Sequence, residues 1–304
     1  MPQRERGRTS TGFHMQLIQR LRNEALRSGA TAQRLQQGVS FERLLARLPL
    51  DGEWVLKGGF ALQLRYGLHA RSTRDLDLRT PHDPNTALDR LRRTIAATTV
   101  TAADHFSFEL GEVARELQGA PGGSLRVRVV ARVAGRDFAT FHIDLSSGDA
   151  LVGSPDLLRG SDLLQFAGIT PVEFPAYPVA QHLAEKLHAY TVPRDQENTR
   201  VRDLVDLVII AATERVEAGR LTDCVEATFA VRGTHPVPQR LPEPPASWAQ
   251  PFTRIAAEAI DIPTTDLSEG YTLAAEFWDP FLVHGTTHCI WLPAERRWSA
   301  GSAY

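Results

Sequence analysis

The sequence predicts an α/β protein in which helices pack against a mixed β-sheet. Three patterns among its 304 residues support this fold class. Apolar residues recur at helical spacing over 13–28 and 31–48, which predicts two amphipathic helices near the N-terminus. Apolar and polar residues alternate over 125–132 and again over 138–145, which predicts the two strands of a hairpin. The same alternation at 75–78 indicates a further strand.

The remaining elements of the N-terminal half follow in order. Residues 1–10 are polar and are predicted to be disordered. Gly29 is expected to end the first helix, because glycine readily adopts the left-handed conformation found after helices. Two prolines break the chain before a helix predicted over 85–98, and residues 105–116 are expected to be a strand or a mixed segment. A glycine-rich cluster over 119–123 indicates a turn beside the hairpin.

The C-terminal half is expected to be mainly helical. Prolines and glycines over 151–178 predict an irregular connection, and 193–199 is a polar loop. Six prolines over 234–251 predict an extended segment, and the last five residues are expected to fray. Helices are predicted over residues 179–191, 200–217, 252–262 and 269–283. The chain thus divides into a core with N-terminal helices at 1–150 and a mainly helical region at 151–304.

The composition is typical of a soluble globular protein, with 42% hydrophobic and 23% charged residues. No stretch approaches the roughly 18 apolar residues of a membrane span, and no signal peptide is recognisable, so no membrane partner is expected. Cys224 and Cys289 lack metal-ligand spacing, which favours two free thiols in the cytoplasm. With a formal net charge of −2, any nucleic acid would have to bind at a local basic patch.

The lysines are rare and their positions are informative. Lys57 and Lys186 are two of 34 basic residues, and all the others are arginines. In an arginine-rich chain a retained lysine indicates a position where a compact ammonium is wanted, although chance retention is the alternative. Lys57 adjoins a Gly-Gly pair, and Lys186 lies in a predicted helix.

The stretch from Lys57 to Leu78 carries the first chemical signal. Lys57-Gly58-Gly59 follows an apolar run, and backbone N–H groups of such a turn at a helix start can bind phosphate. Asp75 and Asp77 alternate with leucines in the predicted strand, so both carboxylates face the same side. Two carboxylates at this spacing can hold a hard cation such as Mg²⁺. The combination suggests phosphoryl or nucleotidyl transfer.

Three later positions extend this constellation. Asp144 lies in Ile-Asp-Leu at the end of a predicted strand, and it adds a third carboxylate to the two metal-binding candidates. Two-metal phosphoryl transfer uses such a set. Lys186 would supply a point charge for a triphosphate, and either Asp203 or Asp206 could orient it. Each motif alone has an ordinary explanation as a solvated strand face, a plain turn or a surface helix, but the ordered set is less easily accidental.

The ordered motifs resemble those of the AbiEii/MenT nucleotidyltransferase toxins, which belong to the DNA polymerase beta-like nucleotidyltransferase superfamily. The similarity covers about residues 54–210. It is carried by these stretches: Lys57-Gly58-Gly59-x-Ala61-Leu62, Arg71-x-Thr73-x-Asp75-Leu76-Asp77-Leu78, Ile143-Asp144-Leu145, Glu185-Lys186-Leu187-x-Ala189 and Arg202-Asp203-Leu204-x-Asp206-Leu207.

The resemblance implies a polymerase beta-like core and a set of functional roles. Asp75, Asp77 and Asp144 would bind Mg²⁺, with Lys186 and Asp203 completing the catalytic set. Phosphate would be bound by Lys57, Gly58, Gly59, Arg71 and Lys186. Such toxins are thought to add nucleotides from an NTP to the tRNA 3′ acceptor end, which blocks translation, and a cognate antitoxin neutralises them. Asp203 is favoured over Asp206 as the functional aspartate.

The resemblance also implies a regulatory position and shows one departure. Thr73, with Ser72 adjacent, occupies the position at which an antitoxin drives phosphorylation in some of these systems. A phosphate there would place about −1.5 to −2 of charge beside the acids and repel a triphosphate. The alternative is that Thr73 merely caps a turn. Phe60 stands where many relatives have a small or hydroxylated residue, which puts part of the phosphate contact in doubt.

A tRNA would need a cationic surface, and arginines are available for it. They are Arg126, Arg128, Arg132 and Arg136 on or near one strand, Arg194, Arg200 and Arg202 around the Lys186 helix, and Arg71 and Arg74 beside the acids. Their alternative role is that of ordinary surface arginines. Two rival functions stay open: nucleotidylation of a small molecule or protein, and a non-catalytic module that binds a nucleotide or an antitoxin.

Overall fold

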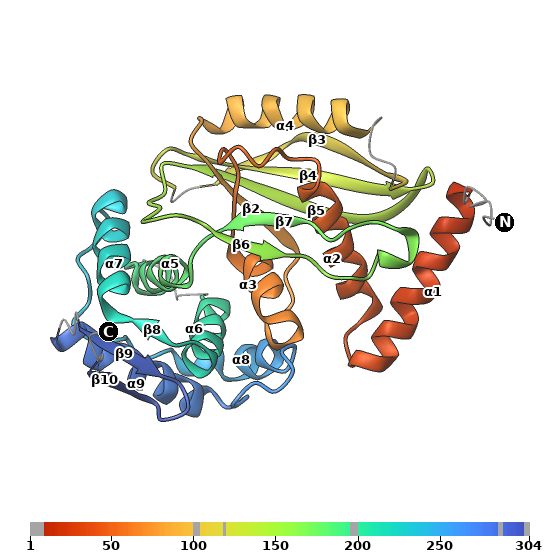
Figure 1. The fold of residues 1–304 in the computed structure, drawn as a ribbon. Helices are drawn as coiled ribbons and strands as arrows, with labels where there is room; N and C mark the ends of the chain where they lie inside the picture. Colours follow the sequence, from red (N-terminus) through yellow and green to blue (C-terminus); the bar gives the residue numbers. More distant parts are fainter. Residues whose placement is uncertain (1–8, 100–103, 118–119, 195–199, 285–287, 301–304) are drawn as a thin grey trace.

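The computed structural model describes residues 9–99, 104–117, 120–194, 200–284 and 288–300 (Figure 1). Most of the predicted disorder at 1–10, most of the polar loop at 193–199 and all but one of the last five residues lie outside this part of the chain.

A seven-stranded mixed sheet forms the centre of the N-terminal part, as predicted. In spatial order its strands are β3 (Phe106–Leu117), β4 (Ser124–Val133), β5 (Arg136–Ser147), β2 (Asp75–Thr80), β1 (Val55–Lys57), β7 (Glu173–Ala176) and β6 (Asp156–Arg159). β2 runs parallel to β5 and antiparallel to β1, and β1 runs parallel to β7. β4 and β5 form the predicted hairpin. Its turn has positive φ at Ala134 and Gly135, so the 119–123 cluster precedes the hairpin.

Helices make up most of the remaining described chain (Figure 1). They are α1 (Ser10–Ser28), α2 (Ala32–Leu45), α3 (Gly58–Tyr66), α4 (Pro84–Thr99), α5 (Val179–Thr191), α6 (Val201–Thr213), α7 (Ala218–Arg232), α8 (Ala249–Ala256) and α9 (Leu267–His284), with short 3₁₀ helices η1 (Gly67–His69), η2 (Gln165–Ala167) and η3 (Ala246–Trp248). Thr9 caps α1 through its hydroxyl, and Gly29 ends it with φ +74°, as expected. Within the described residues, no helix is both long and apolar enough to cross a membrane.

One face of the sheet is apolar and belongs to a continuous core. Leu76 and Leu78 of β2 are fully buried and pack in the same cluster as Phe41 of α2, Leu91 of α4 and Ile143 of β5. Because side chains alternate along a strand, burying the leucines turns the neighbouring polar side chains of β2 to the opposite face. That face points toward the C-terminal helices and carries the candidate site.

A second core holds the C-terminal helices together. It includes Phe277 and Trp278 of α9 and Trp291 of β9, all fully buried. β9 (Cys289–Leu292) pairs with β10 (Arg297–Ala300) and with β8 (Val216–Glu217) in a small separate sheet. The Trp291 indole N–H donates to the carbonyl oxygen of Ala211 on α6 at 2.7 Å, which ties this sheet to the helices.

Several sequence-based expectations were wrong. The 151–178 segment, predicted to be irregular, contributes β6 and β7, so the large sheet extends to Ala176. The helix predicted over 200–217 ends at Thr213 and is followed by β8. The 252–262 helix is shifted, because α8 spans Ala249–Ala256. Three elements had no prediction, namely α7, β9 and β10. β9 and β10 have four residues each, and α7, although 15 residues long, is only weakly amphipathic, so local periodicity gives little signal in these segments.

Glu42 of α2 provides a test of the fold's pH dependence. It is 7% exposed, and burial raises the pKa of its carboxyl from 4.5 to about 7. Folding favours the protonated carboxyl over the carboxylate. The stability that depends on this protonated carboxyl is complete below pH 4.5 and is lost as the pH rises through 7. Between pH 5 and pH 8 the wild type should therefore lose about 2 kcal/mol of unfolding free energy that Glu42→Gln does not lose.

Urea denaturation at the two pH values measures this difference. Glu226→Gln, on an exposed position of α7, is the matched control and should show no such change. A Glu42→Gln effect of equal size at pH 5 and pH 8 would contradict the prediction.

Candidate active site

A row of four charged side chains crosses the polar face of the sheet. Strand register places Lys57 of β1 opposite Asp77 of β2, Asp77 opposite Asp144 of β5, and Asp144 opposite Arg126 of β4. The order is therefore cation, acid, acid, cation. Directly opposed residues of neighbouring strands are close enough to interact, so the two central carboxylates repel each other and each has a cation on its outer side.

Asp75 lies one strand repeat away and joins this row through Arg126. Arg126 donates from Nε to Asp144 Oδ1 at 2.7 Å and from Nη2 to Asp144 Oδ2 at 2.6 Å. The same Nη2 donates to Asp75 Oδ2 at 3.2 Å. His142, the register partner of Asp75, places Nδ1 3.5 Å from Asp75 Oδ1. From the sequence, Arg126 was a candidate for tRNA binding. In the structure Arg126 instead contacts two of the three acids.

Asp77 differs from the other two acids, because its carboxylate has no hydrogen bond or ion pair to any described residue. Burial raises the pKa of Asp77 to about 7, and the nearby charges of Asp144 and Asp75 add to the effect against the opposing charge of Lys57. Excess negative charge around an unpartnered oxygen donor suits a divalent cation. As the side chains stand, however, no three described His, Cys, Asp or Glu residues are gathered around one metal position.

The Gly-Gly pair lets these acids approach the start of α3. Gly58 has φ +66°, and a β-carbon there would lie 2.0 Å from Asp77 Oδ2. A β-carbon on Gly59 would lie 2.8 Å from Thr73 Oγ1. Both glycines line the cavity described below at the N-terminus of a nine-residue helix, where backbone N–H groups lack intrahelical partners. The glycines therefore admit Asp77 and Thr73 and leave amides available for an anion.

Gly58→Ala should displace Asp77 and sharply reduce any activity that depends on it. The substitution combines positive-φ strain of about 1 kcal/mol with a direct clash, so we expect a total destabilisation of about 2–4 kcal/mol. Gly29→Ala is the matched control, because Gly29 has φ +74° with nothing within 4 Å of an added β-carbon. Urea denaturation of both variants isolates the clash, and equal losses would contradict it.

Lys186 of α5 is held by two acids of α6. Its Nζ donates to Asp206 Oδ2 at 2.5 Å and to Asp203 Oδ1 at 3.3 Å. Arg71 Nη2 donates to the same Asp206 oxygen at 2.8 Å. Asp206 is 1% exposed; burial opposes its charged form, but Arg71 and Lys186 outweigh burial and lower the pKa of Asp206. The structure therefore makes Asp206 the anchor of both cations and leaves Asp203 nearer the cavity.

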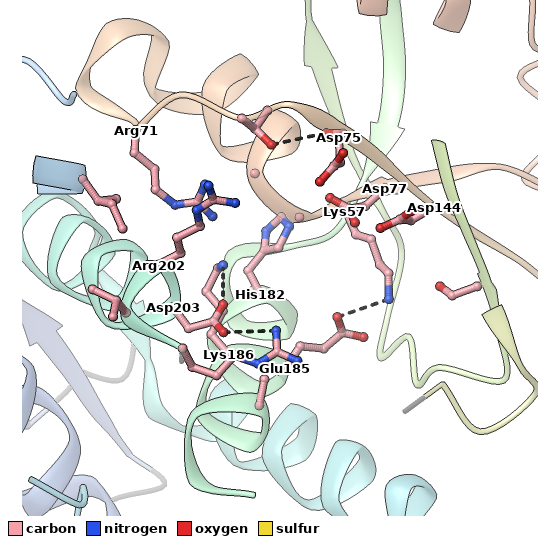
Figure 2. Close-up of a pocket in the computed structure, with 18 of the residues that line it drawn as sticks. Lys57, Arg71, Asp75, Asp77, Asp144, His182, Glu185, Lys186, Arg202 and Asp203 are labelled. Carbon is pink, nitrogen blue, oxygen red and sulfur yellow. Dashed lines mark hydrogen bonds and ion pairs between the residues drawn. The ribbon is translucent and has the colours of Figure 1, made fainter. Parts of the chain in front are cut away.

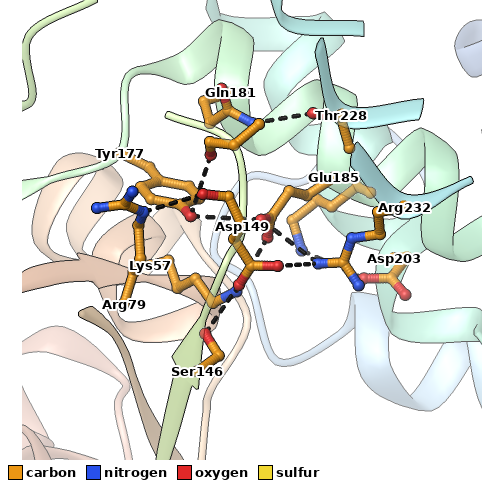
Figure 3. A network of polar contacts seen from close by, with 12 residues as sticks. Lys57, Arg79, Ser146, Asp149, Tyr177, Gln181, Glu185, Asp203, Thr228 and Arg232 are labelled. Atoms are coloured by element: carbon orange, nitrogen blue, oxygen red, sulfur yellow. Dashed lines mark hydrogen bonds and ion pairs between the residues drawn. The ribbon is translucent and has the colours of Figure 1, made fainter. Parts of the chain in front are cut away.

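Lys57 belongs to a second ionic network (Figure 3). Its Nζ lies 2.5 Å from Asp149 Oδ2 and 3.4 Å from Glu185 Oε2. Asp149 has a fully buried side chain and also accepts from Arg232 at 2.7 Å and from Ser146 at 2.8 Å. Burial opposes the charged ammonium, but Glu185 and Asp149 outweigh it and raise the pKa of Lys57. Lys57 is thus charged and already paired with two acids. The sequence predicted a phosphate-binding role for Lys57 but not these partners.

A cavity of about 850 Å³ brings these groups together between the sheet and the C-terminal helices. Figure 2 shows Asp75, Asp77 and Asp144 on one side of it and Lys186 and Asp203 on the other. Its lining includes all the predicted site residues except Ser72: Lys57, Gly58, Gly59, Arg71, Thr73, Asp75, Asp77, Asp144, Lys186 and Asp203. Asp206 also lies outside the lining.

Two positions discussed from the sequence, Ser72 and Phe60, do not line the cavity. Ser72 donates its hydroxyl to Glu258 at 2.5 Å, away from the cavity that Thr73 lines. Phe60 packs on Phe41 with ring centroids 4.8 Å apart and does not line the cavity. Helical rotation after Gly59 turns it into the core, so this departure leaves the cavity wall unchanged.

Sequence reasoning missed other residues of the cavity. His182 lines it, is 2% exposed and has no partner for either ring nitrogen among the described residues. Burial, with Lys186 and Arg65, lowers the pKa of His182 well below 6.5, so the ring is neutral. Asp149 and Glu185 were also missed as partners of Lys57. Glu185 lies in the quoted Glu185-Lys186-Leu187 motif but was given no role, whereas no motif includes His182 or Asp149. His182 lies four positions before Lys186, on the same helix face.

The mixed sheet thus presents three carboxylates on one face, and Lys186 lies across the cavity from them. The sequence profile described as "Nucleotidyl transferase AbiEii toxin, Type IV TA system" matches residues 41–272. The chain belongs to this AbiEii family of nucleotidyltransferase toxins. No curated protein matches it significantly.

Two solved structures show the extent of the similarity. MenT4, the nucleotidyltransferase toxin Rv2826c of Mycobacterium tuberculosis H37Rv, is 19% identical with a TM-score of 0.52, covering 92% of this chain and 99% of its own. JHP933 of Helicobacter pylori is 16% identical with a TM-score of 0.49, covering 83% and 94%. The likeness to MenT4 supports the fold.

Proposed function

We propose that this protein is a toxin that transfers a nucleoside monophosphate from an NTP to the 3′ acceptor end of tRNA with Mg²⁺, thereby blocking translation. Family membership supports a nucleotide substrate and an antitoxin partner. The observation that carries the proposal is the unpartnered Asp77 carboxylate, which lies beside Asp75 and Asp144 and against the N-terminus of α3.

In this reaction the RNA 3′-oxygen attacks the α-phosphorus, the new P–O bond forms, and pyrophosphate leaves. Asp75, Asp77 and Asp144 would hold the divalent metal, which would neutralise phosphate charge and align the attacking and leaving oxygens. Asp144 would alternatively accept the proton of the attacking hydroxyl. The amides of Gly58 and Gly59 and the ammonium of Lys186 would bind the triphosphate, with Asp203 and Asp206 fixing that ammonium.

The cavity rim supplies cations for an RNA backbone. Arg202 and Arg254 line the cavity and are exposed, and Arg194 and Arg200 line it as well. Such contacts position a nucleic acid without reading its sequence and make binding sensitive to salt. Arg132 is a poorer candidate, because it is paired with Glu109 and Asp137.

Of the two adjacent hydroxyl residues, Thr73 is a better candidate for the regulatory position than Ser72. It lines the cavity and donates to the carbonyl oxygen of Asp75 at 3.3 Å, whereas Ser72 is bonded to Glu258. Phosphorylation of Thr73 driven by the antitoxin would place negative charge beside Asp75 and against Gly59. That charge would repel the incoming triphosphate.

The proposal is tested by incubating the protein with Mg²⁺, each labelled NTP and total tRNA, without antitoxin. We expect label on tRNA, and none after periodate oxidation of the tRNA 3′ end. Transfer of label to a metabolite or protein pool instead of tRNA would favour the alternative acceptors. Absence of transfer to any pool, with growth inhibition unchanged by Asp77→Ala, would favour a binding module and overturn the enzymatic proposal.

A further inference from the structure

The acid set is already partly neutralised by this chain itself. Arg126 makes a two-pronged contact with Asp144 and a third contact with Asp75, so it bridges two of the three metal-binding candidates across β4, β5 and β2. A two-pronged guanidinium–carboxylate contact is among the strongest side-chain hydrogen bonds. A cation entering between these acids must therefore compete with Arg126 or bear repulsion from its charge.

The position of Arg126 also gives it access to a ligand. Its side chain is 22% exposed and lines the cavity that contains Lys186 and the Gly-Gly turn. Its third guanidinium nitrogen, Nη1, has no partner among the described residues. The planar fork that fits a carboxylate fits a phosphate equally well. A triphosphate in this cavity would therefore offer Arg126 a second set of acceptors.

We propose that Arg126 couples metal binding to nucleotide binding. Without nucleotide it is the counter-ion of Asp144 and Asp75 and holds the site in a state of low metal affinity. When a nucleoside triphosphate enters, the guanidinium moves to the phosphate oxygens, and the acids become available to the cation. The inference rests on the proposed metal- and nucleotide-dependent function. It adds that the two ligands bind with positive coupling and that one arginine produces most of it.

Arg128 provides a matched control for this role. It lies two residues along β4, so it has the same charge and faces the same side of the sheet. It is exposed, and the described residues include no ion-pair partner for it. Arg126→Gln removes the charge and keeps an amide that can donate to Asp144. Arg126→Lys keeps the charge and loses the fork.

The first measurement is Mn²⁺ binding by electron paramagnetic resonance without nucleotide. We expect Arg126→Gln to bind Mn²⁺ about 5–20-fold more tightly than wild type, Arg126→Lys to fall between them, and Arg128→Gln to stay within about twofold of wild type. Weaker or unchanged binding in both Arg126 variants would overturn the inference. A tightening that persists after Asp77→Asn would also overturn it, because the metal would then lie elsewhere.

The second measurement is the affinity for α,β-methylene nucleoside triphosphates, taken with EDTA and with saturating Mn²⁺. For each protein the nucleotide affinity in Mn²⁺ is divided by the affinity in EDTA. This ratio should be at least about fivefold larger in wild type than in Arg126→Gln. Chelation by free nucleotide is the same for both proteins and cancels. Equal ratios would overturn the inference and leave the proposed function standing, whereas a wild type that binds no Mn²⁺ with or without nucleotide would overturn both.

Discussion

Asp77→Asn is expected to abolish nucleotidyl transfer and growth inhibition while leaving a folded protein. The asparagine keeps the shape of the side chain against Gly58 but removes the charge that a cation needs. Metal stabilisation of transition-state charge is worth several kcal/mol, which corresponds to a loss of about 10³-fold or more in rate. Label transfer to tRNA measures the loss.

The same variant should be more stable than wild type in the absence of metal. Asp77 is buried beside Asp144 and Asp75. Burial, and after it the charges of these two acids, raise its pKa, so folding disfavours the ionised carboxylate. That penalty is absent below the ordinary pKa of 3.8 and is complete above the folded value of about 7. In EDTA at pH 8 we therefore expect a melting temperature a few degrees above wild type.

Asp223→Asn, on an exposed position of α7, is the control for both readouts. It should change neither the rate nor the melting temperature. An Asp77→Asn protein that retains at least a tenth of the wild-type transfer rate would contradict the metal-binding role. One that melts below wild type in EDTA would contradict the expected cost of burying the ionised carboxylate beside two other acids.

Asp206→Ala is expected to destabilise the protein by about 3–5 kcal/mol. Asp206 is the shared partner of Lys186 and Arg71, and both cations are buried. Removing one partner of a buried ionic set leaves charge uncompensated, which costs far more than the loss of a surface pair. Urea denaturation at pH 7.5 measures the effect.

Asp203→Ala is the matched comparison from the same helix. Asp203 contacts Lys186 at the longer distance of 3.3 Å and Arg200 at 3.6 Å, and it lines the cavity. We expect a stability loss of about 1–2 kcal/mol, with the main defect in nucleotide affinity. The two aspartates would then have separate roles, Asp206 in anchoring and Asp203 in the site. Equal stability losses in the two variants would contradict this division.

The sequence predicted the parts of the site that lie within short local patterns. Asp75 and Asp77 alternate with leucines, and the structure puts those leucines in the core and both acids on the opposite face. That outcome follows from the geometry of one strand and does not depend on the rest of the fold. The resemblance to a toxin family likewise rested on ordered motifs, and the match over residues 41–272 confirms it.

Contacts between distant segments could not be predicted in this way. Lys57 and Asp149 are 92 positions apart, and Arg71 and Asp206 are 135 apart. No periodicity reports such pairs, because they depend on the order and register of the strands and on how the helices pack on the sheet. The same reason explains why Arg126 was assigned to a nucleic-acid surface rather than to the acids.

By itself, the sequence determined the fold class, the family and the residue types available for nucleotidyl transfer, because these follow from local periodicity and from motifs in a fixed order. The tertiary structure decided which charges meet. Strand register aligned Lys57, Asp77, Asp144 and Arg126 in one row. Helix packing brought Lys186 into contact with Asp206 as well as Asp203. Charge interactions in a buried site depend steeply on distance and burial, and only the folded chain fixes both.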